Sequence, residues 1–333
     1  MSEPQPAAPP SRATPDLDGD FDRTHAELAG VGASAQQFSR AKLWLLASRP
    51  ATMTAAMAPV LVGGALAKHD QAFSLWPWLF ALLGACFIQL GTNYANDVYD
   101  HEKGADTADR QGPLRVTSAG LVTPQAMKRA MFLAFFSAAL CGVVLVTQAG
   151  WPIVVLGLAS ITAGIAYTGG PYPLGYHGLG DVFVFAFFGI AAVVGTYFVQ
   201  TGHVPLQAWL WSLPVGASCT AILVVNNLRD IATDTLVGKR TLAVRWGPNV
   251  AWSEYVLLAL IASIGPVALA VQAHLAWLAL PLLALPLWLR LAWQLRRAAS
   301  QPQSGLRYNA LLGATARAHL ITAILAAVGL WLC

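Results

Sequence analysis

The chain has 333 residues, of which 56% are hydrophobic and only 11% are charged, with a formal net charge of +4 at pH 7. This composition excludes an ordinary soluble domain and indicates a protein that crosses a membrane several times. The four cysteines lie within apolar segments and match no metal-ligand spacing. They are therefore interpreted as small buried side chains rather than metal ligands.

Residues 1–40 differ from the rest of the chain, because they are rich in Pro, Ala, Ser and Asp and contain no apolar run. Such a composition predicts a disordered tail. The segment also lacks the basic-then-apolar order of a secretory signal, so no cleavage is expected. The sequence thus predicts two parts, a tail over residues 1–40 and a membrane domain over residues 41–333.

Apolar stretches long enough to cross a bilayer as helices follow the tail. Together they predict an all-α fold, a polytopic membrane bundle of about nine helices. The expected spans lie near residues 43–67, 75–97, 127–147, 151–168, 179–200, 207–229, 249–271, 274–294 and 310–332.

The distribution of Lys and Arg predicts how these spans are oriented. If the spans alternate in direction, the tail and the connections after spans 2, 4, 6 and 8 lie on the same side of the membrane. That side has 19 of the 20 Lys and Arg residues, and the opposite side has only Lys68. By the positive-inside rule that side is cytoplasmic. In an inner-membrane protein the N-terminus is therefore expected in the cytoplasm and the C-terminus on the outer side of that membrane. The positive net charge then reflects contact with anionic membrane lipids, and no nucleic-acid partner is expected.

Two acidic clusters stand at the ends of spans 2 and 6, both on the predicted cytoplasmic side. The first extends over residues 93–109 and the second over residues 226–234. Carboxylates beside hydrocarbon are costly, so a functional role is the default interpretation. Spacings of three and four residues place the polar groups of each cluster on one helix face.

The two clusters contain the oxygen ligands that Mg²⁺ prefers, a few carboxylates completed by water and phosphate oxygens. The expected magnesium ligands are Asn96, Asp97, Asp100, Asp106, Asp230 and Asp234. Neighbouring cations are the expected partners of a diphosphate. These are Arg110, Arg115, Arg229, Lys239 and Arg240. The alternative is a pair of solvated acidic loops, and for Asp109 an ion pair with Arg110 or a helix cap stays open.

A third connection, residues 167–181, is rich in Gly and Pro and unusually aromatic. Its tyrosines either line a pocket for an aromatic substrate and stabilise a cation, or form an interfacial aromatic belt. The deeper position of Tyr167 favours function, whereas Tyr172 and Tyr176 stay open. His177 is interpreted as structural, and Asp181 either caps the following helix or joins the site.

The two acidic motifs resemble those of the UbiA-type membrane prenyltransferases. The run Asn96-Asp97-Val-Tyr-Asp100 with the following Asp106 is similar to the first motif of that family, and the pair Asp230 and Asp234 to the second. The resemblance covers the chain from about residue 42. It implies that the motifs bind Mg²⁺ and an isoprenyl diphosphate, with an aromatic acceptor beside them in the bundle.

Further segments are similar to the branch that prenylates 1,4-dihydroxy-2-naphthoate for menaquinone synthesis. They are residues 44–50, 109–115, 167–181, 226–230 and 238–247. The 4-hydroxybenzoate branch usually carries Asp-Thr-x-Tyr-Ala before its second motif, where this chain has Asn-Asn-Leu-Arg. The resemblance implies transfer of a polyprenyl group to the ring with loss of CO₂ and diphosphate.

This resemblance gives roles to individual residues. Catalytic roles go to Asp100, Asp230 and Tyr167, and acceptor contacts to Asn93, Tyr167, Asn226 and Asn227. Two alternatives stay open: another acceptor such as 4-hydroxybenzoate or a haem vinyl group, and a cation-coupled transporter. Prenyl chain length, the general base, the oligomeric state and protein partners do not follow from the sequence.

Overall fold

The computed structural model of the chain describes residues 39–105, 111–299 and 305–333. All regular secondary structure in these ranges is helical, which confirms the all-α prediction. The predicted tail lies outside the described residues, apart from Ser39 and Arg40 at its end. The roles predicted for Asp106, Asp109 and Arg110 also concern residues outside the described ranges.

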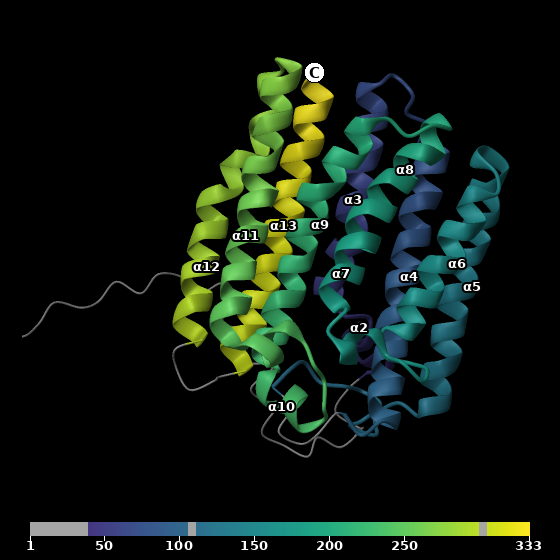
Figure 1. Ribbon diagram of the computed structural model, residues 1–333. Helices are drawn as coiled ribbons and strands as arrows, with labels where there is room; N and C mark the ends of the chain where they lie inside the picture. The colour runs from purple at the N-terminus through teal and green to yellow at the C-terminus, as the bar shows by residue number, and fades with distance from the viewer. Residues whose placement is uncertain (1–38, 106–110, 300–304) are drawn as a thin grey trace, which may run out of the picture. The chain divides into compact units, whose positions relative to one another are not determined.

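The bundle is built from α-helices with three shorter 3₁₀ or π segments (Figure 1). In chain order they are α2 (Arg40–Ser48), α3 (Pro50–His69), α4 (Leu75–Glu102), α5 (Pro124–Ala149), α6 (Pro152–Ala166), η2 (Leu174–His177), α7 (Gly180–Val184), η3 (Phe185–Ala191), α8 (Ala192–Thr201), α9 (Leu206–Arg229), α10 (Ile231–Leu236), α11 (Leu242–Ala273), η4 (Ala276–Ala284), α12 (Leu285–Ala299) and α13 (Gly305–Leu332).

Each predicted span corresponds to helical structure. In the described part of the chain, eight helical segments are long and apolar enough to cross a membrane, and α6 is a shorter apolar helix of 15 residues. A straight helix needs about 20 residues to cross the hydrocarbon core of a bilayer. The chain is therefore an integral, multi-pass membrane protein.

The first predicted span, 43–67, is two helices rather than one. Arg49 adopts a left-handed conformation with φ +49°, which ends α2 and precedes Pro50, the first residue of α3. Proline disfavours the right-handed helical conformation in the residue before it and is well suited to a first helical position. The break leaves the carbonyl groups at the end of α2 free to accept hydrogen bonds from neighbouring side chains.

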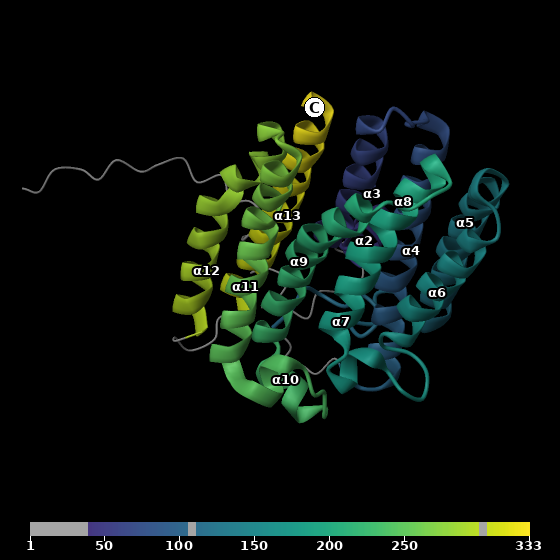
Figure 2. The same cartoon turned by 45° about the horizontal axis from the view of Figure 1, so that its top comes forward.

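Helix α3 lies between the two helices that carry the acidic motifs. It packs against both α4 and α9, and also against α8 and α13 (Figures 1 and 2). Segment η3, which has π-helical geometry, crosses α9 at a close glycine contact. A Cβ added at Gly189 would lie 2.6 Å from the Cα of Gly216. The bundle is thus tight beside α9 but leaves α4 and α9 apart, on either side of α3.

Candidate active site

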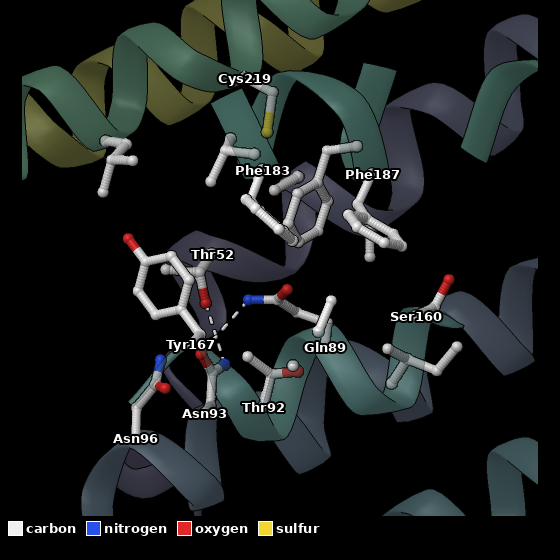
Figure 3. Close-up of a pocket in the computed structure, with 18 of the residues that line it drawn as sticks. Thr52, Gln89, Thr92, Asn93, Asn96, Ser160, Tyr167, Phe183, Phe187 and Cys219 are labelled. Carbon is white, nitrogen blue, oxygen red and sulfur yellow. Dashed lines mark hydrogen bonds between the residues drawn. The ribbon is translucent and has the colours of Figure 1, made fainter. Parts of the chain in front are cut away.

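A cavity of about 390 Å³ lies among these helices (Figure 3). This volume falls in the range of small-molecule sites. Its charged end is lined from the end of α4, the end of α9, α10 and three connections, and its polar residues there include Asn96, Asp100, Arg115, Tyr176, Asn226, Asn227, Asp230, Asp234 and Lys239. Its apolar lining comes from helix interiors and includes Leu145, Ile153, Leu156, Phe183, Phe187, Phe188 and Val199. One space therefore joins a charged region to a hydrocarbon-lined region.

Lys239 joins the two acidic motifs. Its Nζ lies 3.9 Å from Oδ1 of Asp100 and 3.5 Å from Oδ1 of Asp234. The end of α4 and helix α10, which follows α9, are far apart in sequence but converge on one cation, as the pattern of the two motifs indicated. Because Lys239 is itself only partly exposed, the three charges lie in surroundings where their attraction is weakly screened.

Asp100 is held from two further directions. Its Oδ2 accepts a hydrogen bond from Nη2 of Arg115 at 2.7 Å, and its Oδ1 accepts one from the hydroxyl of Tyr176 at 3.1 Å. Both Asp100 and Arg115 are buried but line the cavity. A buried carboxylate needs such hydrogen-bond partners to replace its lost hydration, so the orientation of Asp100 depends on two connections outside α4.

Tyr176, which the sequence left between function and aromatic belt, lies in the wall of the cavity. The Nζ atoms of Lys103 and Lys239 lie 4.9 Å and 4.8 Å from the centre of its ring. The backbone N–H of Arg240 donates to the Tyr176 carbonyl at 2.9 Å. Through this residue the 167–181 and 237–241 connections pack together beside Asp100, which favours the functional interpretation.

The second motif is organised by Arg229. Its guanidinium donates to both oxygens of Asp230, at 2.8 Å and 2.7 Å, to Oδ1 of Asn226 at 2.7 Å and to Oδ1 of Asn309 at 2.9 Å. Arg229 is only 2% exposed and is not among the cavity-lining residues. The structure therefore uses Arg229 to orient Asp230 and Asn226, and does not present it to the cavity as a diphosphate-binding group.

Asp97 also lies away from the cavity. It is 1% exposed, and its Oδ1 accepts a hydrogen bond from the backbone N–H of Thr117 at 3.0 Å. Asp97 lies three residues before Asp100, at the border of the helix face that lines the cavity, and its side chain contacts the segment that carries Thr117. The structure does not bring Asp97 together with the other expected metal ligands; it fixes the 115–117 segment instead.

The amides of α4 do line the cavity. The hydroxyl of Thr168 donates to Oδ1 of Asn96 at 2.9 Å. Nδ2 of Asn93 donates to the Ser48 carbonyl at 2.8 Å and to Oγ1 of Thr52 at 3.0 Å. The free carbonyl at the end of α2 therefore has its partner in the cavity wall, so the Arg49–Pro50 break helps to shape the site.

Tyr167, for which the sequence predicts an acceptor contact, lines the cavity. Glycines let the connection close around its ring, since a Cβ at Gly180 would lie 2.9 Å from the Tyr167 hydroxyl oxygen. Arg240, by contrast, is exposed, and it contacts Tyr176 through its backbone N–H.

Asp234 combines exposure to the cavity with an unusual titration. Burial raises the pKa of its carboxyl to about 6, against the opposing effect of nearby Lys239. A group with such a pKa gives up its proton readily when a cation approaches at neutral pH. Asp234 is therefore suited to bind a divalent ion, and the affinity of the site for that ion should decrease as the pH falls towards 6.

The donor set fits a magnesium–diphosphate complex better than a bare ion. Among the described residues, no three His, Cys, Asp or Glu side chains form a group that holds a metal alone. Asp100, Asp230 and Asp234 nevertheless line one cavity with the amides of Asn96 and Asn226. Mg²⁺ characteristically takes one or two carboxylates and completes its shell with water and phosphate oxygens.

Three residues at this site were not predicted from the sequence: Gln89, Lys103 and Asn309. Gln89 lines the cavity, and Lys103 contacts Thr168 and Tyr176, which line it. Gln89 lies one turn before Asn93 on the same face of α4, so its spacing within an apolar segment was a usable signal. Lys103 donates to the Thr168 carbonyl at 2.5 Å. Asn309 had no local signal, because its contact with Arg229 depends on how α13 packs beside α9.

Comparison with known proteins gives consistent matches. The sequence profile of the UbiA prenyltransferase family matches residues 56–312. The chain is 37% identical to the 1,4-dihydroxy-2-naphthoate octaprenyltransferase of Escherichia coli, over 89% of this chain and 97% of that one. It is also 37% identical to the Mycobacterium tuberculosis protein of the same name, over 76% and 86%.

Solved structures show the same fold. The structure of a UbiA homolog from Archaeoglobus fulgidus bound to DMAPP and Mg²⁺ aligns with a TM-score of 0.64 at 13% identity, covering 87% of this chain and 99% of that one. The apo structure of a UbiA homolog from Aeropyrum pernix also gives 0.64, at 14% identity over 83% and 96%. With a family match over most of its length, this chain belongs to the UbiA prenyltransferase family.

Proposed function

We propose that this protein transfers a polyprenyl group from an allylic polyprenyl diphosphate to a ring carbon of 1,4-dihydroxy-2-naphthoate, giving demethylmenaquinol. The observation that carries the proposal is the convergence of Asp100, Asp234 and Lys239 at one end of an apolar cavity. The choice of acceptor is supported by the names of relatives at 37% identity that align over most of both chains.

The diphosphate is bound in the charged region of the cavity. Arg115 and Lys239 supply positive charge there, and Asp100, Asp230 and Asp234, with Asn96 and Asn226, would hold Mg²⁺. When bound, magnesium supplies charge neutralisation for the leaving diphosphate. Arg229 keeps Asp230 and Asn226 in place for this role, since outer hydrogen bonds orient metal ligands.

The reaction breaks the allylic C–O bond, whose electron pair leaves with the diphosphate. A ring carbon of the acceptor donates an electron pair to form the new C–C bond, and loss of CO₂ returns electrons to the ring. Lys239 and Arg115 stabilise the growing negative charge on the leaving group. The apolar lining keeps water from the allylic cation, while the ring face of Tyr167 favours positive charge nearby.

The direct test is a transfer assay with purified protein, Mg²⁺, farnesyl diphosphate and a choice of acceptors. We expect prenylated naphthoquinol with one CO₂ released for each diphosphate, and no activity in EDTA. Transfer to 4-hydroxybenzoate in preference to 1,4-dihydroxy-2-naphthoate would replace the acceptor assignment. Diphosphate-independent solute uptake without any prenyl transfer would favour a transporter and refute the enzyme assignment.

We also propose that the charged end of the cavity faces the cytoplasm and the C-terminus faces outside. The support is the one-sided distribution of Lys and Arg. Cys333 is an exposed free thiol, whereas Cys141 and Cys219 are buried. A membrane-impermeant maleimide should therefore label intact spheroplasts, and Cys333→Ser should remove that label. Labelling only after the membrane is permeabilised would reverse the orientation.

A further inference from the structure

We infer that Gln89 accepts a hydrogen bond from a ring hydroxyl of the acceptor and thereby orients it, an inference that rests on the proposed function. Gln89 is on α4, lines the cavity and is 7% exposed. It belongs to neither acidic motif. Figure 3 shows its carboxamide reaching into the space faced by Tyr167, Phe183 and Phe187.

The direction of the Gln89 amide is fixed by a chain of hydrogen bonds. The Ser48 carbonyl can only accept, so the group of Asn93 that contacts it at 2.8 Å must be the Nδ2 donor. The Oδ1 of Asn93 is then turned to Gln89, 3.3 Å from its Nε2. Because that contact requires a donor, Gln89 must present its nitrogen to Asn93 and its oxygen elsewhere.

The Oε1 atom of Gln89 is buried and has no hydrogen-bond partner in the protein. An unsatisfied carbonyl in an apolar site costs free energy, so a ligand that brings a donor is favoured there over hydrocarbon. The prenyl chain has no donor. The acceptor has two ring hydroxyls, and its carboxylate, being only a hydrogen-bond acceptor, cannot bind this oxygen. The ligand class is therefore a hydroxylated aromatic ring.

The position of Gln89 along α4 agrees with an acceptor that binds next to the diphosphate. Gln89 precedes Asp100 by 11 residues, which at 1.5 Å per residue is roughly 16 Å along the helix. That interval accommodates the diphosphate beside Asp100 followed by the fused rings of the acceptor. A ring hydroxyl of the acceptor donates to Gln89, and the acceptor carboxylate cannot take that position. The acceptor therefore binds in one orientation, with one ring carbon facing the allylic group.

The test compares Gln89→Met, which keeps size and removes the polar group, with wild type. With farnesyl diphosphate saturating, we expect the KM for 1,4-dihydroxy-2-naphthoate to rise roughly tenfold to a hundredfold, as for other buried hydrogen bonds. The KM for farnesyl diphosphate should stay unchanged. The melting temperature should change little, because the variant removes the donor to Asn93 but also removes the unpaired Oε1. Ser160→Ala is the matched control, because its hydroxyl lines the same cavity but donates to the Leu156 carbonyl of its own helix; all its constants should match wild type.

Analogues that lack one ring hydroxyl, used as competitive inhibitors, identify the bonded group. In wild type one of the two monohydroxy analogues should bind roughly tenfold more weakly, and Gln89→Met should abolish that penalty. Equal affinity of both analogues and the parent compound in wild type would overturn the inference without any variant. So would an unchanged acceptor KM in Gln89→Met. Failure of wild type to prenylate the naphthoate at all is a different result and refutes the proposed function.

Discussion

The two acidic motifs lie at one cavity but are supported in different ways. Asp100 of the first motif is oriented by Arg115 and Tyr176, which come from two connections outside its helix. Asp230 of the second is oriented by Arg229, its own neighbour in sequence. The first carboxylate therefore depends on how the connections pack, whereas the second is held largely by the end of α9 itself.

The largest effect is expected from Asp100→Asn. This change removes a charge that faces Arg115, Tyr176 and Lys239 together and leaves the cations without their shared partner. We expect prenyl transfer to fall about a thousandfold or more, since charge stabilisation of the leaving group supplies several kcal/mol. Steady-state turnover in purified protein measures this.

Glu102→Gln is the matched control for that variant. Glu102 lies on the same helix two residues later, but it forms an exposed ion pair with Lys128. Exposed pairs of this kind contribute little to stability, so both activity and melting temperature should be retained. Near-normal turnover of Asp100→Asn, or an equal loss in Glu102→Gln, would contradict the role given to the first motif.

Arg229→Lys tests the internal support of the second motif. Lysine keeps the charge but loses the fork that contacts both oxygens of Asp230 and the branch that reaches Asn309. We expect magnesium affinity, read from the dependence of rate on Mg²⁺, to fall roughly tenfold to a hundredfold, as for other groups that orient metal ligands. The KM for the acceptor should change much less. Loss confined to the acceptor KM would contradict this role.

Tyr176→Phe tests the external support of the first motif. It removes the hydrogen bond to Asp100 and retains the ring between Lys103 and Lys239. We expect about a tenfold loss of kcat/KM, in keeping with one hydrogen bond to a charged group. Tyr172→Phe is the control, because the Tyr172 ring stacks on His177 and does not line the cavity. A loss as large as that of Asp100→Asn would mean that the hydroxyl has a further role.

The same contrast explains what the sequence could predict. Spacing within one helix placed Asn96 and Asp100 on one face, and hydropathy and charge predicted the helical bundle and the convergence of two motifs. Asp97 was expected among the metal ligands from its spacing to Asp100, whereas its hydrogen bond from the Thr117 N–H depends on how a connection outside α4 packs. Arg229 carries the charge expected of a phosphate ligand, but burial commits that charge to Asp230. Contacts that depend on packing between distant elements, such as that of Arg229 with Asn309, have no corresponding pattern in the local sequence.

The smallest effect is expected from pH, and it concerns Asp234 of the second motif. Burial raises the pKa of Asp234 to about 6, so this carboxyl takes up a proton as pH falls from neutrality. Protons then compete with the cation, and apparent magnesium affinity should fall about twofold at pH 6 relative to pH 7.5. Rates measured at subsaturating Mg²⁺ should show this decline, and saturating Mg²⁺ should suppress it. Asp234→Asn should have weaker magnesium binding with little pH dependence over this interval. If the decline persists in that variant, the titrating group belongs elsewhere in the cavity.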